Sequence, residues 1–147
     1  MTTRWRNIPL PEEYLIALAL GTLAHVLVPV PLPLAAGILR VLGAALAALG
    51  FALIAWSVRA ARDVDVAQPA ALITHGPYAR SRNPMYLGWT ALVLGIALLV
   101  GSVWMLIAVA AGWSYLQAVT IPGEEASLRQ AFGEAFEAYR RRARRWL

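Results

Sequence analysis

The segment "HGPYARSRNPMYLG", residues 75–88, lies between two long apolar stretches and carries more chemistry than a connector needs. It holds two prolines, two arginines, two tyrosines, a histidine and an asparagine within fourteen residues. A linker between apolar helices requires only polar, flexible residues, so this density indicates a loop that holds a ligand. The same residues also suit a plainer role, with arginines as topology anchors and tyrosines as an interfacial aromatic belt. The pattern by itself leaves both interpretations open.

The composition around this loop is that of a membrane protein. The chain has 147 residues, of which 60% are hydrophobic and 14% charged, whereas a soluble domain has roughly half and a quarter. We therefore expect one integral membrane domain, residues 1–147. The absence of cysteine excludes disulfides, thiolate nucleophiles and cysteine metal sites. With only two histidines we expect no metal site.

Four apolar stretches approach the roughly 17–25 residues of a spanning helix, which predicts an all-α polytopic protein. They cover residues 14–28, 37–58, 85–100 and 103–121. If all four span, then twelve of the thirteen arginines fall on one side, and only Arg40 falls on the other. This distribution predicts cytoplasmic N- and C-termini in a plasma or inner membrane protein, and it argues against nucleic-acid binding. A cleaved signal peptide is the competing interpretation of the start, but Glu12 and Glu13 favour a retained first helix.

Short connections predict how the helices pack. The first two stretches are joined by "VPVPLPLAAG", residues 28–37, so we expect them to be antiparallel neighbours. Gly43, Ala47 and Gly50 permit close helix approach within one bundle. The third and fourth stretches are separated by little more than Gly101 and Ser102, which predicts a tight hairpin.

Beyond residue 121 the pattern becomes amphipathic. Apolar residues recur at spacings of three, four or seven, which predicts one helix on the membrane surface or over the cytoplasmic ends of the spans. Gly133 within it indicates a close contact or a bend. The apolar positions are Leu128, Phe132, Phe136, Tyr139 and Trp146.

Two polar clusters flank the base of the hairpin, namely the 74–88 loop and the pair Glu124 and Glu125. Because an antiparallel hairpin returns its end beside its start, we expect both clusters to form one pocket at the cytoplasmic face. Arg82, at the start of the third span, favours an anionic group such as a carboxylate or phosphate. Glu124 and Glu125 favour a cation or sugar hydroxyls, although both could simply stabilise a helix start.

Local signals within the loop predict its shape. Gly76 and Pro77 predict a turn, Pro84 the first turn of the third span, and Asn83 its N-cap. Tyr78 or Tyr86 could stack on a flat base.

Both clusters belong to longer motifs that resemble a known family. Residues 75–88 resemble the G-P-Y-x-x-x-R-H-P-x-Y-x-G signature of the isoprenylcysteine carboxyl methyltransferase and phospholipid methyltransferase superfamily. The later "GEEASLRQAFGEAFEAYRRR" resembles its E-E-x-x-L-x-x-x-F-G-x-x-Y-x-x-Y-x-x-R segment. The two motifs keep the family's order and are separated by a helical hairpin. Asn83 stands where histidine is common, and Phe136 replaces a frequent tyrosine.

The resemblance implies an enzyme that transfers a methyl group from S-adenosylmethionine to a lipid-like acceptor, leaving S-adenosylhomocysteine. It places the cofactor within residues 74–147, at the cytoplasmic face. By position, the first motif would supply His75, Gly76, Pro77, Tyr78, Arg82, Asn83, Pro84, Tyr86, Leu87 and Gly88. Glu124 and Glu125 would complete the cofactor pocket. The resemblance implies catalytic roles for Glu125, Tyr139 and Arg142.

Several questions of function stay open at this point. The acceptor could be a carboxylate, giving carboxyl O-methylation, or a lipid amine, giving N-methylation. An amine must lose a proton, for which His75, Glu124 or Glu125 are the candidates. The alternative is a non-catalytic membrane scaffold or lipid-binding protein that retains the fold. A transporter is disfavoured because no acidic and basic pair lies within the apolar stretches.

Overall fold

The computed structural model of the chain describes residues 11–62 and 71–146, and its regular elements are all helices. The described part therefore confirms the all-α prediction. Its short 3-10 turn η2 covers Gly76–Ala79. The α-helices are α1 (Glu12–Leu27), α2 (Ala36–Ala61), α3 (Pro84–Val100), α4 (Val103–Tyr115), α5 (Ile121–Phe132) and α6 (Glu134–Arg142).

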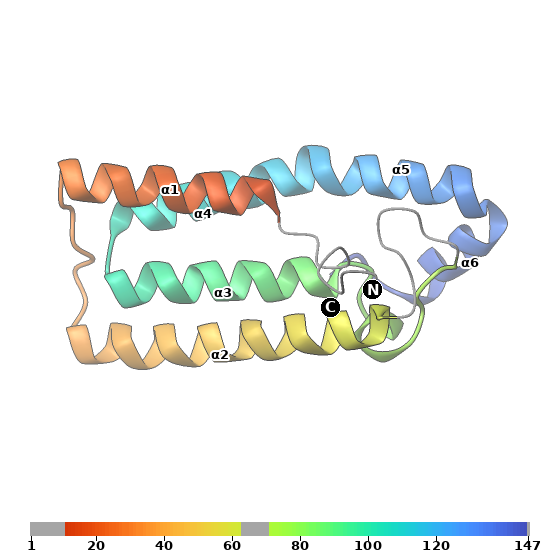
Figure 1. The fold of residues 1–147 in the computed structure, drawn as a ribbon, viewed down its shortest axis with the longest axis horizontal. Coiled ribbons are helices and arrows are strands. Elements are labelled where there is room, and N and C mark those ends of the chain that lie inside the picture. Colours follow the sequence, from red (N-terminus) through yellow and green to blue (C-terminus); the bar gives the residue numbers. More distant parts are fainter. Residues whose placement is uncertain (1–10, 63–70, 147) are drawn as a thin grey trace, which may run out of the picture.

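The helices pack in two pairs, α2 against α3 and α1 against α4 (Figure 1). Figure 1 shows α3 lying between α1 and α2, so the prediction that the first two helices are neighbours is wrong. The reason is the extended path of their connection, which crosses the tip of the α3–α4 hairpin. Leu32 N–H donates to the Gly101 carbonyl at 2.8 Å, and Val103 N–H donates to the Val30 carbonyl at 3.1 Å.

Glycines allow α2 and α3 to approach closely. A Cβ atom on Gly95 would lie 2.6 Å from the Ala47 nitrogen and 2.7 Å from the Gly43 carbonyl oxygen. On the same interface, a Cβ on Gly50 would lie 2.6 Å from the Gly88 carbonyl oxygen. These distances are too short for any side chain, so the expected close packing through Gly43, Ala47 and Gly50 is confirmed.

The α3–α4 hairpin is as tight as its sequence indicates. Gly101 ends α3 in the left-handed conformation, with φ of 68°, which suits a residue without Cβ. Ser102 then caps α4 by accepting a hydrogen bond from the Met105 N–H.

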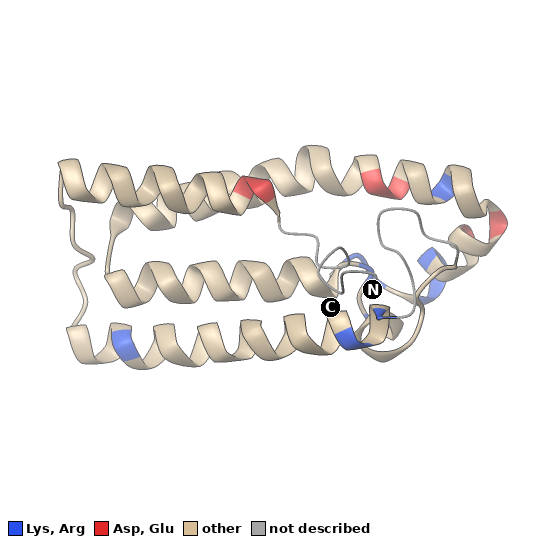
Figure 2. Cartoon of the chain, in the orientation of Figure 1, with Lys and Arg blue, Asp and Glu red and all other residues tan. Residues whose placement is uncertain are grey.

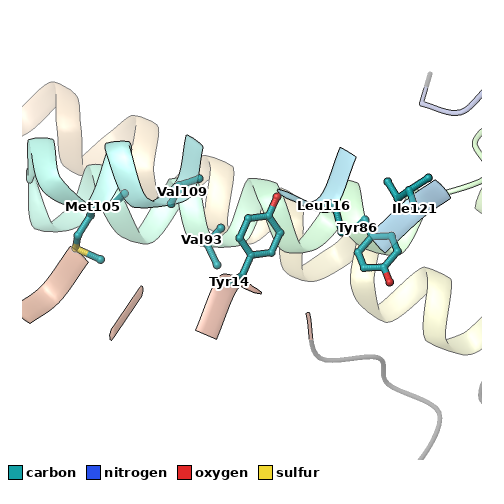
Figure 3. Close-up of a cluster of buried hydrophobic side chains, with 8 residues drawn as sticks. Tyr14, Tyr86, Val93, Met105, Val109, Leu116 and Ile121 are labelled. Carbon is teal, nitrogen blue, oxygen red and sulfur yellow. The ribbon is translucent and has the colours of Figure 1, made fainter. Parts of the chain in front are cut away.

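A cluster of buried side chains joins α1, α3 and α4 (Figure 3). Tyr14 of α1 is 1% exposed, and its hydroxyl shares a 2.7 Å hydrogen bond with Thr90 Oγ1 of α3. The first helix is therefore held to the bundle by a polar contact as well as by packing. The labelled members of the cluster are Tyr14, Tyr86, Val93, Met105, Val109, Leu116 and Ile121.

Large apolar side chains cover the outward surfaces of the bundle, especially on α1 and α2. Val26, Leu27 and Val41 are about 70% exposed. By length and composition, two helices could cross a membrane: α2 and the continuous 30-residue helix Val103–Phe132. α3 is equally apolar but has 17 residues, and α1 has 16. Such surfaces fit a hydrocarbon environment better than water.

The fourth apolar stretch continues as helix beyond residue 121. A π-helical turn, Leu116–Thr120, connects α4 to α5 without a break, and α5 projects past the bundle (Figure 1). Gly133 then ends α5 with φ of 49°, and its missing Cβ would meet open space. This glycine marks a bend rather than a close contact.

The prediction of one amphipathic helix beyond residue 121 is wrong, because the bend divides this segment into α5 and α6. The apolar stripe is divided between α5 and α6, and its two halves meet across the bend in a second cluster. There Phe136 and Tyr139 are buried, with Leu128 and Phe132 packed against them. Trp146 leaves the stripe and contacts Trp113 of α4, with ring centroids 4.5 Å apart.

Candidate functional site

A cavity of about 560 Å³ lies where α3 begins and α5 leaves the bundle. Its volume is in the range of small-molecule sites. Its walls come from residues 71–73, η2, the start of α3, the π-helical turn, α5 and α6. The lining residues are Ala71, Leu72, Ile73, Tyr78, Arg82, Asn83, Pro84, Met85, Tyr86, Val119, Thr120, Gly123, Glu124, Ser127, Leu128 and Tyr139.

The loop before α3 takes the shape that its prolines and glycine favour. Gly76 has φ of 60°, and η2 begins there with proline at its second position. Pro84 opens α3 and Asn83 occupies the N-cap position, as predicted. The Asn83 side chain, however, does not cap the helix. Its Nδ2 donates instead to the Arg145 carbonyl at 3.0 Å, so the amide ties the loop to the segment after α6.

One polar wall of the cavity joins α3 to α5. The Tyr86 hydroxyl donates to Glu124 Oε1 at 2.5 Å. Thr120, in the π-helical turn, donates through Oγ1 to Glu13 Oε1 at 2.7 Å. Since Glu13 belongs to α1, the first helix also supports this wall. A carboxylate and a phenol that face the same cavity can accept hydrogen bonds from hydroxyl or ammonium groups.

The second polar feature near the cavity is an ion-pair network around Glu125, which is 7% exposed. Arg82 donates to Glu125 Oε1 through Nη2 at 2.9 Å and Nε at 3.2 Å. Arg145 donates to Glu125 Oε2 through Nη2 at 2.7 Å. Arg82 and Glu125 stand 43 positions apart in the sequence, so the hairpin does bring the two polar clusters together. Of this network, Arg82 lines the cavity.

Tyr139 closes the cavity from the side of α6. Its hydroxyl donates to the Tyr78 carbonyl at 2.8 Å, which joins α6 to η2. Burial raises the pKa of Tyr139 to about 12 and also raises the pKa of Tyr78 above its ordinary value. Both phenols therefore stay protonated at neutral pH, and Tyr139 acts as a hydrogen-bond donor.

The cavity collects about half of the residues that the motifs indicate. Seven of them line it: Tyr78, Arg82, Asn83, Pro84, Tyr86, Glu124 and Tyr139.

The other indicated residues lie outside the lining. His75 is exposed before η2, Pro77 is buried within it, and Leu87 is half-buried on α3. Gly76 faces α2, where a Cβ would lie 3.2 Å from the Ala60 Cβ. Arg142 is exposed at the end of α6.

Gly88 serves helix packing. A Cβ at this position would lie 2.8 Å from the Ile54 Cγ1 and 2.9 Å from the Gly50 carbonyl oxygen. A glycine here permits the α2–α3 contact that places the start of α3, and so its place in the motif has a packing reason.

Other lining residues were not singled out from the sequence. Thr120 and Val119 fall within an apolar stretch that we assigned to the membrane, and they face the cavity from the π-helical turn. Leu72 and Leu128 add apolar walls from segments far apart in the chain. Of these four residues, only Leu128 had been noted in the sequence, as a member of the amphipathic apolar stripe. Within residues 11–62 and 71–146, no three His, Cys, Asp or Glu side chains gather in a way that could hold a metal ion.

The fold and the cavity together define an all-helical protein of membrane type with a polar site at one end of its bundle. A comparison with protein-family models matches residues 38–135 to the phospholipid methyltransferase family. Since the match covers about two thirds of the sequence, the chain belongs to this family, and the resemblance carried by the motifs is confirmed. Membership implies S-adenosylmethionine-dependent methyl transfer to a lipid. No curated protein matches the chain.

Proposed function

We propose that the protein is an S-adenosylmethionine-dependent methyltransferase of a membrane lipid, with its site at the cytoplasmic face. In this proposal α1 to α4 span the membrane, and the last helical turns of the 30-residue helix project into the cytoplasm. Figure 2 supports this orientation, because the charged residues gather at the end of the bundle that carries α5 and α6. Arg40 belongs to the first turns of α2, and Figure 1 shows that α2 starts at the end of the bundle away from α5 and α6.

The donor set at the cavity fits the methyl donor. S-adenosylmethionine has a carboxylate, an ammonium group, a ribose and a flat base. The cavity offers the Arg82 guanidinium for an anion, Glu124 for hydroxyls or a cation, and Tyr78 for stacking. Apolar residues such as Leu72 and Leu128 complete the walls. The observation that carries the proposal is the presence of Tyr78, Arg82 and Glu124, from both motifs, on one cavity of suitable size.

The cofactor, when bound, supplies a methyl group already activated by its sulfonium charge. The residues of the chain then have to orient the reactants and exclude water. Met85 and Val119 supply apolar surface to the cavity. Tyr139, by holding the Tyr78 carbonyl, keeps η2 against the site as a positioning residue.

The family points to a phospholipid, and we propose an amine of its head group as the acceptor. Such an amine must lose a proton before or during transfer. Glu124 lines the cavity, whereas Glu125 is engaged by two arginines and His75 lies outside the lining. We therefore assign proton acceptance to Glu124, held by the Tyr86 hydroxyl. A carboxylate acceptor would need no base, so loss of Glu124 would affect it less.

The proposal is tested by titrating the detergent-purified protein with S-adenosylhomocysteine in a calorimeter. We expect saturable binding by the wild type and markedly weaker binding by Arg82→Gln. Glu134→Gln, at an exposed position on α6 away from the cavity lining, is the matched control and should bind as the wild type does. If the folded wild type shows no binding, the donor site is refuted and a non-catalytic lipid-binding role is favoured.

A further inference from the structure

The segment after α6, residues 143–146, runs along the 80–83 loop, and we call it the strap. The two segments pair through their backbones in parallel, with a bridge between Ser81 and Arg144. Arg144 N–H donates to the Arg80 carbonyl at 3.1 Å, and Arg82 N–H donates to the Arg144 carbonyl at 2.8 Å. The loop that precedes α3 is therefore fixed by a partner about sixty residues later in the chain.

Side chains add a second set of contacts between strap and loop. Arg82 Nη1 donates to the Ala143 carbonyl at 2.7 Å. The Arg145 carbonyl accepts hydrogen bonds from Asn83 Nδ2 at 3.0 Å and from Ser81 Oγ at 3.3 Å. Arg82 and Asn83 both line the cavity, so the strap, which does not line it, holds two of its polar residues in place.

Arg145 contributes a charge as well as a carbonyl. Its guanidinium engages Oε2 of Glu125, while Arg82 engages Oε1 of the same carboxylate. A carboxylate held at both oxygens cannot rotate freely, so the plane of Glu125 and with it the orientation of Arg82 are fixed. The Arg82 side chain is 11% exposed, which leaves it little room to adopt another arrangement.

The strap is anchored at its far end. Trp146 packs on Trp113 of α4, with ring centroids 4.5 Å apart, at the edge of the main buried cluster. Within the described part of the chain, the lining of the cavity includes no strap residue. The strap also lies beyond residues 38–135, which are the ones that match the family model.

We propose that Arg145 is a positioning residue of the donor site, which acts through Glu125 to hold Arg82 toward the cavity. The strap supplies the frame in which it does so. The inference rests on the proposed function, because it assigns Arg82 to the anionic end of the methyl donor. The wall made by Tyr86 and Glu124 is hydrogen-bonded separately, so loss of the Arg145 guanidinium should disturb Arg82 and leave that wall in place.

The test compares S-adenosylhomocysteine affinity in the wild type, Arg145→Gln, Arg145→Lys and the control Arg141→Gln. Arg141 is an exposed arginine on α6, outside the network. We expect Arg145→Gln to bind about tenfold more weakly, since small misplacements of a site residue have effects of this order or larger. Arg145→Lys should recover most of the affinity because it keeps the charge, and Arg141→Gln should leave affinity unchanged.

A spectroscopic measurement separates positioning from loss of the strap. The close Trp113–Trp146 pair should give a near-ultraviolet circular dichroism signal that Trp146→Phe removes. In Arg145→Gln this signal should persist, because the backbone pairing remains. Its loss together with the affinity would assign an anchoring role to Arg145 and overturn the proposal.

The remaining outcomes are equally decisive. Binding by the wild type with unchanged affinity in Arg145→Gln would overturn the role of Arg145 and leave the donor site intact. An equal loss in Arg141→Gln would indicate a general effect of positive charge and would also overturn it. No binding by the wild type would refute the donor site itself, and this inference with it.

Discussion

Replacement of Glu125 by alanine should lower the stability of the protein more than the same replacement of its neighbour Glu124. Glu125 is 7% exposed and is the shared partner of Arg82 and Arg145. Its removal leaves the Arg82 guanidinium, on a side chain only 11% exposed, without a counter-charge, which is the costly way to break an ion pair. The adjacent Glu124 lines the cavity and is bonded by the Tyr86 hydroxyl.

The size of the effect follows from the burial of the partners. Loss of one member of a buried pair costs about 3–5 kcal/mol. We expect about 3 kcal/mol, because the Arg145 side chain is 37% exposed and Arg82 keeps its bond to the Ala143 carbonyl. For a chain of this size, about 2–4 °C per kcal/mol converts this into a midpoint lower by about 6–12 °C.

The assay is thermal unfolding of the detergent-purified protein, followed by tryptophan fluorescence. Glu124→Ala is the matched control, and it should lower the midpoint by about 2–4 °C because it removes one hydrogen bond of about 1 kcal/mol. If Glu125→Ala melts within about 2 °C of the wild type, the Glu125 network does not hold the fold as we infer.

Two further predictions concern the helix interface and the phenol of Tyr139. Gly95→Ala should lower stability by about 1–3 kcal/mol, since its Cβ would lie 2.6 Å from the Ala47 nitrogen. Gly37→Ala, with no atom within 4 Å of its Cβ, should be neutral or stabilising in the same melting assay; equal effects would contradict the packing argument. Because the pKa of Tyr139 is raised from 10.0 to about 12, its stabilising contribution is complete below pH 10 and is lost as the pH rises toward 12. Tyr139→Phe should therefore lose less stability than the wild type between pH 10 and pH 12, as followed by unfolding at stepped pH, and parallel losses would refute this.

The sequence predicted the parts of the fold that depend on local patterns. Apolar stretches gave the main helices to within a few residues, and Gly101 with Ser102 predicted the hairpin turn. The hairpin in turn predicted that the 74–88 loop and the Glu124–Glu125 pair would meet, and the structure brings Arg82 within 2.9 Å of Glu125. Each of these inferences needs only helix length, turn chemistry and chain direction.

Other features depend on tertiary structure and could not be predicted in this way. The short connection after α1 indicated an α1–α2 pair, but the extended segment crosses the hairpin tip and α1 packs on α4. The π-helical turn Leu116–Thr120 has no local signature, yet it turns Thr120 and Val119 toward the cavity. The side-chain amide of Asn83 donates a hydrogen bond to the Arg145 carbonyl of the strap instead of capping α3, and the local rules for helix caps do not predict this contact.

The sequence indicated which residues belong to the candidate site, but it did not show which of them face the cavity. The motifs indicated twelve cofactor residues, but a motif position can also be required for packing, as Gly88 is against Gly50 and Ile54. Glu125 and Glu124 looked equivalent as neighbours in sequence. A helix directs adjacent side chains about 100° apart, and so one faces the arginine network and the other the cavity.

The central claim, methyl transfer to a lipid, is tested most directly by following the methyl group itself. The purified protein is incubated in vesicles of an amine-headed phospholipid with S-adenosylmethionine that carries an isotopically labelled methyl group, and the extracted lipids are analysed by mass spectrometry. We predict labelled head groups that increase with time, and none with Glu124→Gln. Unlabelled lipid after incubation with folded protein that binds S-adenosylhomocysteine would contradict the assignment of a phospholipid amine as the acceptor.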